Sequence, residues 1–289
     1  MIKFWDCFSF FSEVDILELR IRHLWDHVDH FVISESNRTH QNVPKKFILP
    51  ELLNGELEWA REKIIPIYLE IEDPYLLPKS SYNITKENRV FGQGCDSIGW
   101  RIENYQRNSA LRVLESIDDN DIVMVSDLDE IPNSNFLEMI GGITEQNTMF
   151  RLGINSHNYY LNVIQLHNGS PSNFMGNAIG KRKFLTTPQN WRRSIGAWEG
   201  AMGYHFSWMV NRIDQKLYAT AHDELQERFK LEEIRKKASN LEDMFDRPDY
   251  TLIPFNPEID NQFPKSFIQY KSKFPNLFYG THNPIITRL

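Results

Sequence analysis

The residues best suited to chemistry lie in the segment Val125 to Pro132, which reads Val-Ser-Asp-Leu-Asp-Glu-Ile-Pro and follows an apolar run that begins at Ile122. Alternate side chains of an extended strand point to the same face, so Asp127 and Asp129 can present their carboxylates to one point beyond the end of the strand. Oxygen ligands placed in this way suit Mg²⁺ or Mn²⁺ holding a diphosphate. Turns are also rich in Asp, and Pro132 marks a turn, so turn capping is the alternative interpretation.

A strand, a helix and a second strand are predicted at the start of the chain, ahead of this segment. Ile2 to Trp5 reads as a short strand, Asp6 to Ser12 as a loop and His30 to Ser34 as the next strand. Between them, apolar residues recur at helical spacing, namely Val14, Leu17, Ile21, Leu24, Trp25 and Val28. Parallel strands joined by a helix collect ligands at their carboxyl ends, so the polar residues that follow each strand are candidates for a binding site.

The later pattern is also typical of an α/β protein. The predicted strands are Lys63 to Leu69, Ile122 to Val125, Met149 to Leu152 and Ile179 to Leu185. A helix is predicted from Trp100 to Leu114, and Asp73 to Gly99 reads as a long loop of the kind that covers sites. A second amphipathic helix is marked by Leu225, Phe229, Ile234, Ala238, Leu241 and Phe245. We expect one domain over residues 1–289, with a C-terminal helical elaboration.

Composition limits the class of protein and its partners. The chain has 289 residues and a net charge of −7, which argues against a broad nucleic-acid-binding face. No apolar run approaches the roughly 18 residues that a membrane span requires, and the first residues have no signal-peptide layout. Cys7 and Cys95 match no zinc or redox spacing, so reduced, structural cysteines are expected. We expect a cytoplasmic protein, with a peripheral position at a membrane where glycans are assembled as the alternative. The oligomeric state stays open.

Two further groups of residues have a functional and a structural interpretation. The basic segment that comprises Lys181, Arg182, Lys183, Arg192 and Arg193 is either a phosphate or acceptor site or a solvated surface. His23, His27 and His30 include an i, i+4 pair that suits a metal. Because acidic residues interleave and His30 already belongs to the next strand, a polar helix end is the preferred interpretation of the histidines.

Several blocks in order resemble glycosyltransferase family 17. They are Asp6 to Arg20, Val28 to Thr39, Asp121 to Pro132, Gly203 to Trp208, Lys216-Leu217 and Phe263 to Lys265. The resemblance implies a GT-A-like α/β nucleotide-sugar-binding fold, with a mostly parallel central sheet flanked by helices. It also implies UDP-N-acetylglucosamine as donor, a divalent metal, Mn²⁺ or Mg²⁺, and inversion at the anomeric carbon. Because the chain shows no membrane anchor of the kind that animal members carry, the expected acceptor is any glycan hydroxyl and not only an N-glycan.

The resemblance assigns roles around the metal. Asp129 is expected to be the principal ligand, and Asp127 a second ligand or a contact to ribose and water. His205 would complete the metal shell, with a core histidine as the alternative. Lys216 is a candidate phosphate partner or a surface lysine. Arg107, on the helix before the metal strand, would pair with the diphosphate or orient the aspartates, with a structural ion pair as the alternative.

Five glutamates complete the set of candidates. Glu13 and Glu35, at the first two strand ends, would contact the base or ribose of the nucleotide, although Glu13 also suits the first turn of a helix. Inversion requires a general base that takes the proton of the acceptor hydroxyl. Glu199 is nominated for that role, with Glu130 and Glu224 as competitors, and each of the three also suits a structural position.

Two other classes of protein compete with the transferase. Haloacid-dehalogenase-like phosphatases also end an apolar strand in Asp-x-Asp, but their motif continues Gly-Thr near the amino terminus, whereas Glu130-Ile131 follows here in mid-chain. A non-catalytic carbohydrate-binding protein with a glycosyltransferase fold is the second competitor. The aspartates and His205 favour turnover over binding alone.

Overall fold

The computed structural model describes residues 1–78, 97–133, 136–139, 149–192, 197–198, 201–222, 224–260 and 263–280. The longer strands are β1 (Phe4–Phe10), β2 (His30–Ser36), β3 (Ile64–Leu69), β4 (Ile122–Asp127), β6 (Phe150–Asn158), β7 (Val163–His167), β9 (Asn173–Lys181), β11 (Gly203–Ser207) and β12 (Tyr250–Pro254). Three short strands are β5 (Glu130–Pro132), β8 (Ser170–Pro171) and β10 (Ala197–Trp198).

The helices are α1 (Val14–Leu24), α2 (Leu49–Leu53), α3 (Ile98–Asn108), α4 (Leu111–Leu114), α6 (Pro188–Trp191), α7 (Ile213–Ala219), α8 (Glu224–Arg228), α9 (Leu231–Asn240) and α10 (Lys265–Gln269). Single 3₁₀ turns are η1 (Glu58–Ala60), η2 (Pro74–Leu76), η4 (Arg182–Phe184), η5 (Val210–Arg212) and η6 (Pro275–Leu277). Within the described ranges, no helix is both long enough and apolar enough to cross a bilayer.

One sheet joins the strands of the described residues, in the order β12-β7-β6-β9-β4-β1-β2-β3. The half formed by β4, β1, β2 and β3 is parallel, and β9, β6, β7 and β12 continue it with antiparallel pairing. Strand β11 lies off this path, parallel to β6 and antiparallel to β5. The predicted GT-A-like α/β fold is confirmed, but the sheet is mixed and not mostly parallel.

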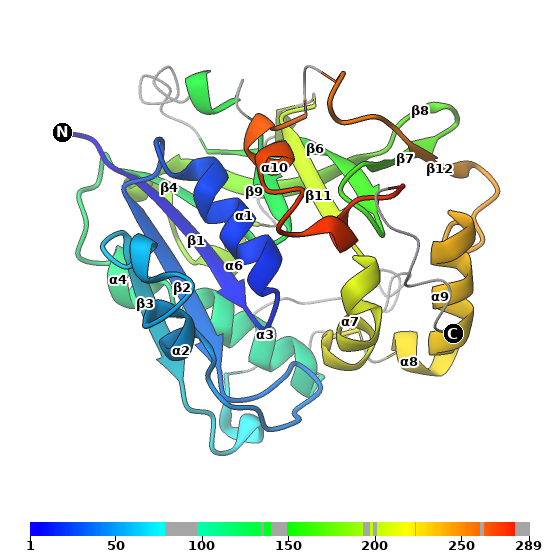
Figure 1. Cartoon of the computed structure of the whole chain (residues 1–289). Helices are drawn as coiled ribbons and strands as arrows, with labels where there is room; N and C mark the ends of the chain where they lie inside the picture. The colour runs from blue at the N-terminus through cyan, green and yellow to red at the C-terminus, as the bar shows by residue number, and fades with distance from the viewer. Residues whose placement is uncertain are drawn as a thin grey trace.

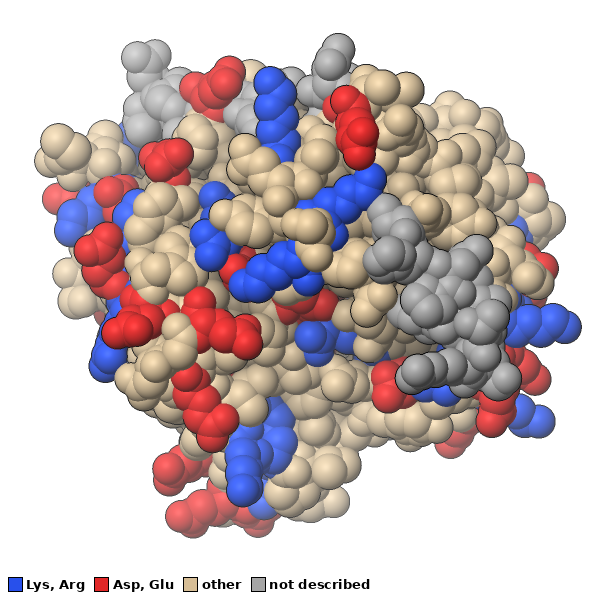
Figure 2. Space-filling model, viewed as in Figure 1, with Lys and Arg blue, Asp and Glu red and all other residues tan. Residues whose placement is uncertain are grey.

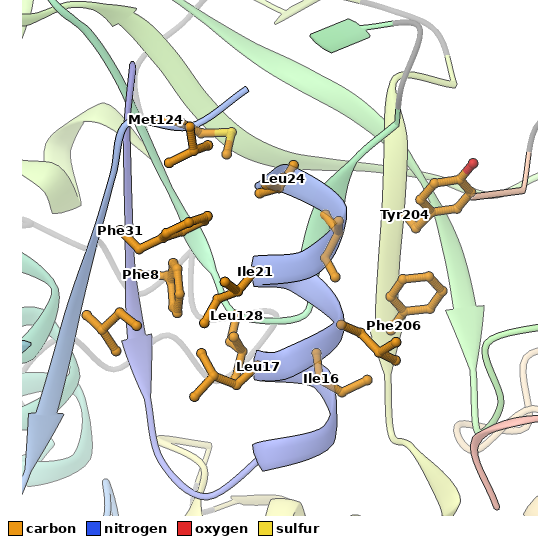
Figure 3. Close-up of a cluster of buried hydrophobic side chains, with 14 of the residues drawn as sticks. Phe8, Ile16, Leu17, Ile21, Leu24, Phe31, Met124, Leu128, Tyr204 and Phe206 are labelled. Carbon is orange, nitrogen blue, oxygen red and sulfur yellow. The ribbon is translucent and has the colours of Figure 1, made fainter. Parts of the chain in front are cut away.

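Helices cover both faces of the parallel half (Figure 1) because its strands are apolar on both sides. Phe8 of β1, Phe31 of β2 and Met124 of β4 pack on one face against α1. The residues that alternate with them pack against α3, α4 and α6 on the other face, namely Trp5, Cys7, Val32, Val123 and Val125. In Figure 3, α1 lies between this part of the sheet and Phe206 of β11. The strand ends are therefore fixed from both faces.

Strand β1 differs from the prediction. It runs to Phe10, so most of the predicted loop, Asp6 to Ser12, is strand. Asp6 suggested a break because it is charged, but its carboxylate is fully buried against Arg20 of α1, with Nη2 to Oδ1 at 2.7 Å. The strand therefore continues through Asp6 because a buried ion pair neutralises its charge.

Other elements are confirmed with shifted bounds. The helices and strands predicted around α1, β2, β3, α3 and β4 are present, and Met149 to Leu152 is the start of the longer β6. Ile179 to Leu185 is instead the end of β9 followed by η4. The predicted C-terminal helix is divided into α8 and α9. Residues 79–96 of the predicted loop, and Cys95 with them, lie outside the described residues, and the single-domain assignment stays a prediction.

Charge and cysteine placement follow the composition. Figure 2 shows both acidic and basic side chains on the visible face. Cys7 is a free, buried cysteine, and burial raises the pKa of its thiol well above the ordinary value. The burial of Cys7 agrees with the expected structural cysteine.

Candidate active site

A pocket of about 200 Å³ opens at the carboxyl ends of β1, β2 and β4. Ser9 and Ser36 line it from the first two strands, Arg107 from α3 and Lys216 from α7. Both aspartates of the Asp-x-Asp segment also lie on its wall. The pocket is where parallel α/β sheets bind ligands, because the strands end there and the connecting loops diverge.

Asp129 contacts two of the predicted site residues. The Nζ of Lys216 lies 3.0 Å from its Oδ2, and the Nε2 of His205 lies 3.9 Å from the same oxygen. His205 reaches this position because β11 pairs antiparallel with β5, which places His205 opposite Glu130. Burial alone would lower the pKa of Lys216, but Asp129 raises it above the ordinary value, so the amine is protonated. Three residues that are distant in sequence thus meet, and two of them, Asp129 and Lys216, line the pocket.

His205 is suited to act as an uncharged imidazole that offers a nitrogen lone pair. Its ring stacks on Phe174 at a centroid distance of 4.2 Å, and its side chain is 17% exposed. Burial lowers the pKa of its imidazole, although Asp129 opposes the effect. A histidine that is uncharged near neutral pH has a nitrogen lone pair available for a proton or a metal ion.

Asp127 is paired with two arginines. Arg107 donates from Nη2 to its Oδ1 at 2.7 Å, and Arg192 donates from Nη2 to its Oδ2 at 2.8 Å. Burial alone would raise the pKa of Asp127, but the two guanidinium groups outweigh it and hold this pKa well below the usual range. Arg107 thus contacts Asp127, and its role toward a diphosphate stays a prediction. The Asp127 side chain is 40% exposed, but both of its oxygens already have a guanidinium group within 2.8 Å.

Glu130 has a structural position in the turn. Its side chain is 1% exposed. Arg192 donates to both of its oxygens, at 2.5 and 2.7 Å, and the backbone amide of Asp127 donates to Oε2 at 3.1 Å. A base must reach an acceptor hydroxyl with a free oxygen, so these contacts oppose the predicted catalytic role of Glu130. Glu130 fixes the turn and holds Arg192, a member of the predicted basic segment.

Arg20 holds the Asp-x-Asp turn from inside the protein, and the sequence analysis did not identify it. The side chain is fully buried, and its Nη1 donates to the carbonyl oxygens of Asp127, Leu128 and Glu130 at 3.0, 3.1 and 2.8 Å. Its Nε and Nη2 donate to Asp6 at 2.8 and 2.7 Å. A signal was present, because Arg20 interrupts the apolar face of α1 and Asp6 interrupts an apolar strand.

The two glutamates predicted to contact the nucleotide have different surroundings. Glu13 lies on the pocket wall, and its Oε2 accepts from the amides of Phe11 and Ser12 at 3.3 and 3.0 Å. Glu35 is fully buried, and its oxygens accept from the Nζ of Lys45 and from two amides at the start of α2. These contacts oppose the predicted role of Glu35, because its carboxylate is engaged in fixing the loop before α2.

The remaining candidates do not join this cluster. Glu199 and Arg193 lie outside the described residues, and the side chain of Glu224 on α8 is not described. His23 is structural, as expected, because its ring nitrogens lie 2.9 Å from the Oγ of Ser266 and 2.9 Å from the carbonyl of Pro132. Glu199 and Glu224 stay predictions for the base.

The side chains present suit a divalent cation whose remaining coordination positions are filled by a bound ligand. In the described part of the chain, no group of three or more His, Cys, Asp and Glu side chains is arranged to hold a metal ion. Asp129 and His205 offer one oxygen and one nitrogen, 3.9 Å apart. Mg²⁺ and Mn²⁺ sites that bind substrate phosphates use one or two protein groups together with the phosphates and water. These two residues are therefore the ones that would hold a divalent ion here.

The sequence matches known proteins over different lengths. Human and rat β-1,4-mannosyl-glycoprotein 4-β-N-acetylglucosaminyltransferase are each 29% identical over 141 residues, which is 46% of this chain. The matched part covers only 23% of the length of these relatives. Among solved structures, 4-diphosphocytidyl-2C-methyl-D-erythritol synthase aligns over 69% of this chain and 90% of its own, with a TM-score of 0.38 and 11% identity. S. aureus TarS aligns over 73% and 61%, with a TM-score of 0.37 and 11% identity.

The family profile matches much more of the chain. Glycosyltransferase family 17 matches residues 2–246, which include the whole Asp-x-Asp turn, β11 and α7. This match supports a glycosyltransferase over the phosphatase and the non-catalytic binding protein. The chain belongs to glycosyltransferase family 17.

Proposed function

We propose that this enzyme transfers N-acetylglucosamine from UDP-N-acetylglucosamine to a glycan hydroxyl, with a divalent cation and with inversion at the anomeric carbon. The observation that carries the proposal is the meeting of Asp129, His205 and Lys216 at the carboxyl edge of the parallel strands. The names of the curated relatives support the sugar and suggest a β-mannoside as the acceptor.

Charged side chains on the pocket wall suit a diphosphate and a cation together. Among the described residues, the lining has five basic side chains, Arg38, Lys45, Arg107, Arg212 and Lys216, and four acidic ones, Glu13, Glu103, Asp127 and Asp129. A divalent ion held by Asp129 and His205 would add positive charge where the diphosphate binds.

The reaction forms a bond from the acceptor oxygen to the anomeric carbon while the bond from that carbon to the β-phosphate oxygen breaks. The acceptor proton passes to the general base, and UDP leaves with the electron pair. When bound, the cation neutralises charge on the diphosphate. Lys216 and Arg107 line the same pocket as protonated donors, so they stabilise the negative charge that grows on the leaving phosphate.

Release of the nucleoside diphosphate, UDP or GDP, from a panel of sugar nucleotides tests the proposal directly. We expect UDP release from UDP-N-acetylglucosamine with a β-mannoside acceptor in Mn²⁺ or Mg²⁺, and none after chelation. UDP-glucose, UDP-galactose and GDP-mannose serve as competing donors, and NMR of the product gives the anomeric configuration. Preference for another donor, undiminished turnover in a chelator, or retention at the anomeric carbon would each contradict the corresponding part of the proposal.

A further inference from the structure

The two aspartates of the Asp-x-Asp segment have different partners. Both oxygens of Asp127 accept from guanidinium groups, at 2.7 Å from Arg107 and 2.8 Å from Arg192. The arginine side chains are 5% and 10% exposed, so neither charge is well solvated. Asp129 is instead paired with Lys216, whose side chain is 34% exposed. Charge-assisted bonds to buried guanidinium groups are the stronger and less easily exchanged of the two kinds.

The arginines are themselves fixed by other carboxylates. Arg107 also donates to Glu103 at 2.7 Å, and Arg192 contacts both oxygens of Glu130. A cation placed against Asp127 would be repelled by two positive groups that already lie within 2.8 Å of its oxygens. Moving either arginine aside would leave a buried charge without its partner, which is costly.

We propose that Asp127 is a positioning residue and not a cation ligand: it is the shared counter-ion of Arg107 and Arg192, and Asp129 is the aspartate that meets the donor. The proposal rests on the proposed function, which supplies the donor and the cation. Under this proposal, Asp127 fixes the position of Arg107 on the pocket wall and links Arg192 to the Asp-x-Asp turn. Loss of Asp127 therefore weakens the binding of the nucleotide diphosphate without removing the cation site.

Calorimetric titration of UDP at several Mn²⁺ concentrations separates the two aspartates without any turnover. In Asp129→Asn, the Mn²⁺ concentration that gives half-maximal UDP binding is expected to rise at least about tenfold, as for loss of a ligand. In Asp127→Asn, that concentration is expected to stay within about twofold, while UDP affinity at saturating Mn²⁺ falls about tenfold. An equal rise in the Mn²⁺ requirement of both variants would overturn the proposal.

A thermal double-mutant cycle tests the same network without a ligand. Asp127→Asn and Arg192→Met should each lower Tm, and the loss in the double variant should fall short of the sum by about 3 °C or more. Additive losses would overturn the proposal, whether or not UDP binds. If wild type binds no UDP but the cycle shows coupling, the proposed function fails and the ion-pair network stands. Arg192→Lys, which keeps the charge, replaces Arg192→Met if that variant does not fold.

A matched control pair lies outside the pocket lining. Arg247 donates to Asp243 from Nε and Nη2 at 3.0 and 2.6 Å, so it forms a carboxylate–guanidinium pair in another part of the chain. Asp243→Asn and Arg247→Met should show coupling in Tm, with UDP affinity and the Mn²⁺ requirement unchanged. A change in UDP affinity in this control would show that loss of stability alone perturbs the pocket, which would also overturn the proposal.

Discussion

The Nζ of Lys216 lies 3.0 Å from the Oδ2 of Asp129, although 87 positions separate the two residues in the chain. This contact joins α7 to the turn after β4 across the mouth of the pocket. Lys216 also lies 3.2 Å from the Oγ of Ser207, which fixes its amine near the end of β11. The lysine is thus positioned both to neutralise Asp129 and to meet a phosphate that binds beside it.

Replacing Lys216 should weaken use of the donor. In Lys216→Met, kcat/KM for the sugar nucleotide is expected to fall about 10²-fold, because a protonated donor to the leaving phosphate is lost. Lys216→Arg should recover part of the loss, since it keeps the charge. Initial rates of UDP release measure both variants. Unchanged kcat/KM in Lys216→Met would contradict the assigned role.

Asp129 should be needed for transfer, whereas an exposed acid elsewhere should not. Asp129→Ala is expected to lower kcat by about 10²–10³-fold, because the site loses the carboxylate that holds the cation. Asp26, on the surface after α1, gives the control variant Asp26→Ala, which should retain wild-type rates. Equal activity of the two variants would refute the proposed centre.

His205 should set the metal requirement. His205→Ala is expected to raise the half-saturating Mn²⁺ concentration about 10- to 100-fold, as for loss of a metal ligand, while excess Mn²⁺ restores part of the rate. His167→Ala, on β7, where the ring stacks on Tyr250, is the control. The dependence of UDP release on Mn²⁺ concentration gives the measurement. A lower rate with an unchanged Mn²⁺ requirement would assign His205 another role.

Arg20 should contribute strongly to stability as well as to the site. Arg20→Met leaves Asp6 buried without its partner and frees three carbonyl oxygens of the turn, so unfolding free energy should fall by about 3–5 kcal/mol. Arg112→Met, at an exposed arginine on α4, should change it by less than about 0.5 kcal/mol. Urea unfolding followed by circular dichroism tests this. Similar losses in the two variants would contradict the role of Arg20.

Acid should destabilise the fold through His157. The side chain is buried, which lowers its pKa from 6.5 to about 4, and its Nδ1 lies 2.8 Å from the carbonyl oxygen of Leu161. Between these pKa values the unfolded chain binds more protons, so the stability is present above about pH 6.5 and is lost as pH falls toward 4. The loss is about 3 kcal/mol. In His157→Gln, Tm should depend less steeply on pH in this window, and an unchanged slope would contradict the assignment.

The sequence by itself determined most of the helices and strands and the position of the Asp-x-Asp segment after a strand. Apolar periodicity predicted α1, β2 and β4, because each buries a repeating face. The polar residues after the strands predicted the edge where the pocket lies, and the family blocks brought His205 and Lys216 to the same site. These inferences succeeded because they depend on local spacing and on the rule that parallel strands end together.

Only the tertiary structure decided how the charges are shared. Asp6 is buried because Arg20 neutralises it. The two oxygens of Asp127 are bound by Arg107 and Arg192, and the carboxylate of Glu35 is bound by the loop before α2. A carboxylate that binds a ligand and one that neutralises a buried arginine look alike in sequence. Which role each adopts is set by the distance to cations and by loss of solvent, and both arise when segments far apart in the chain pack together.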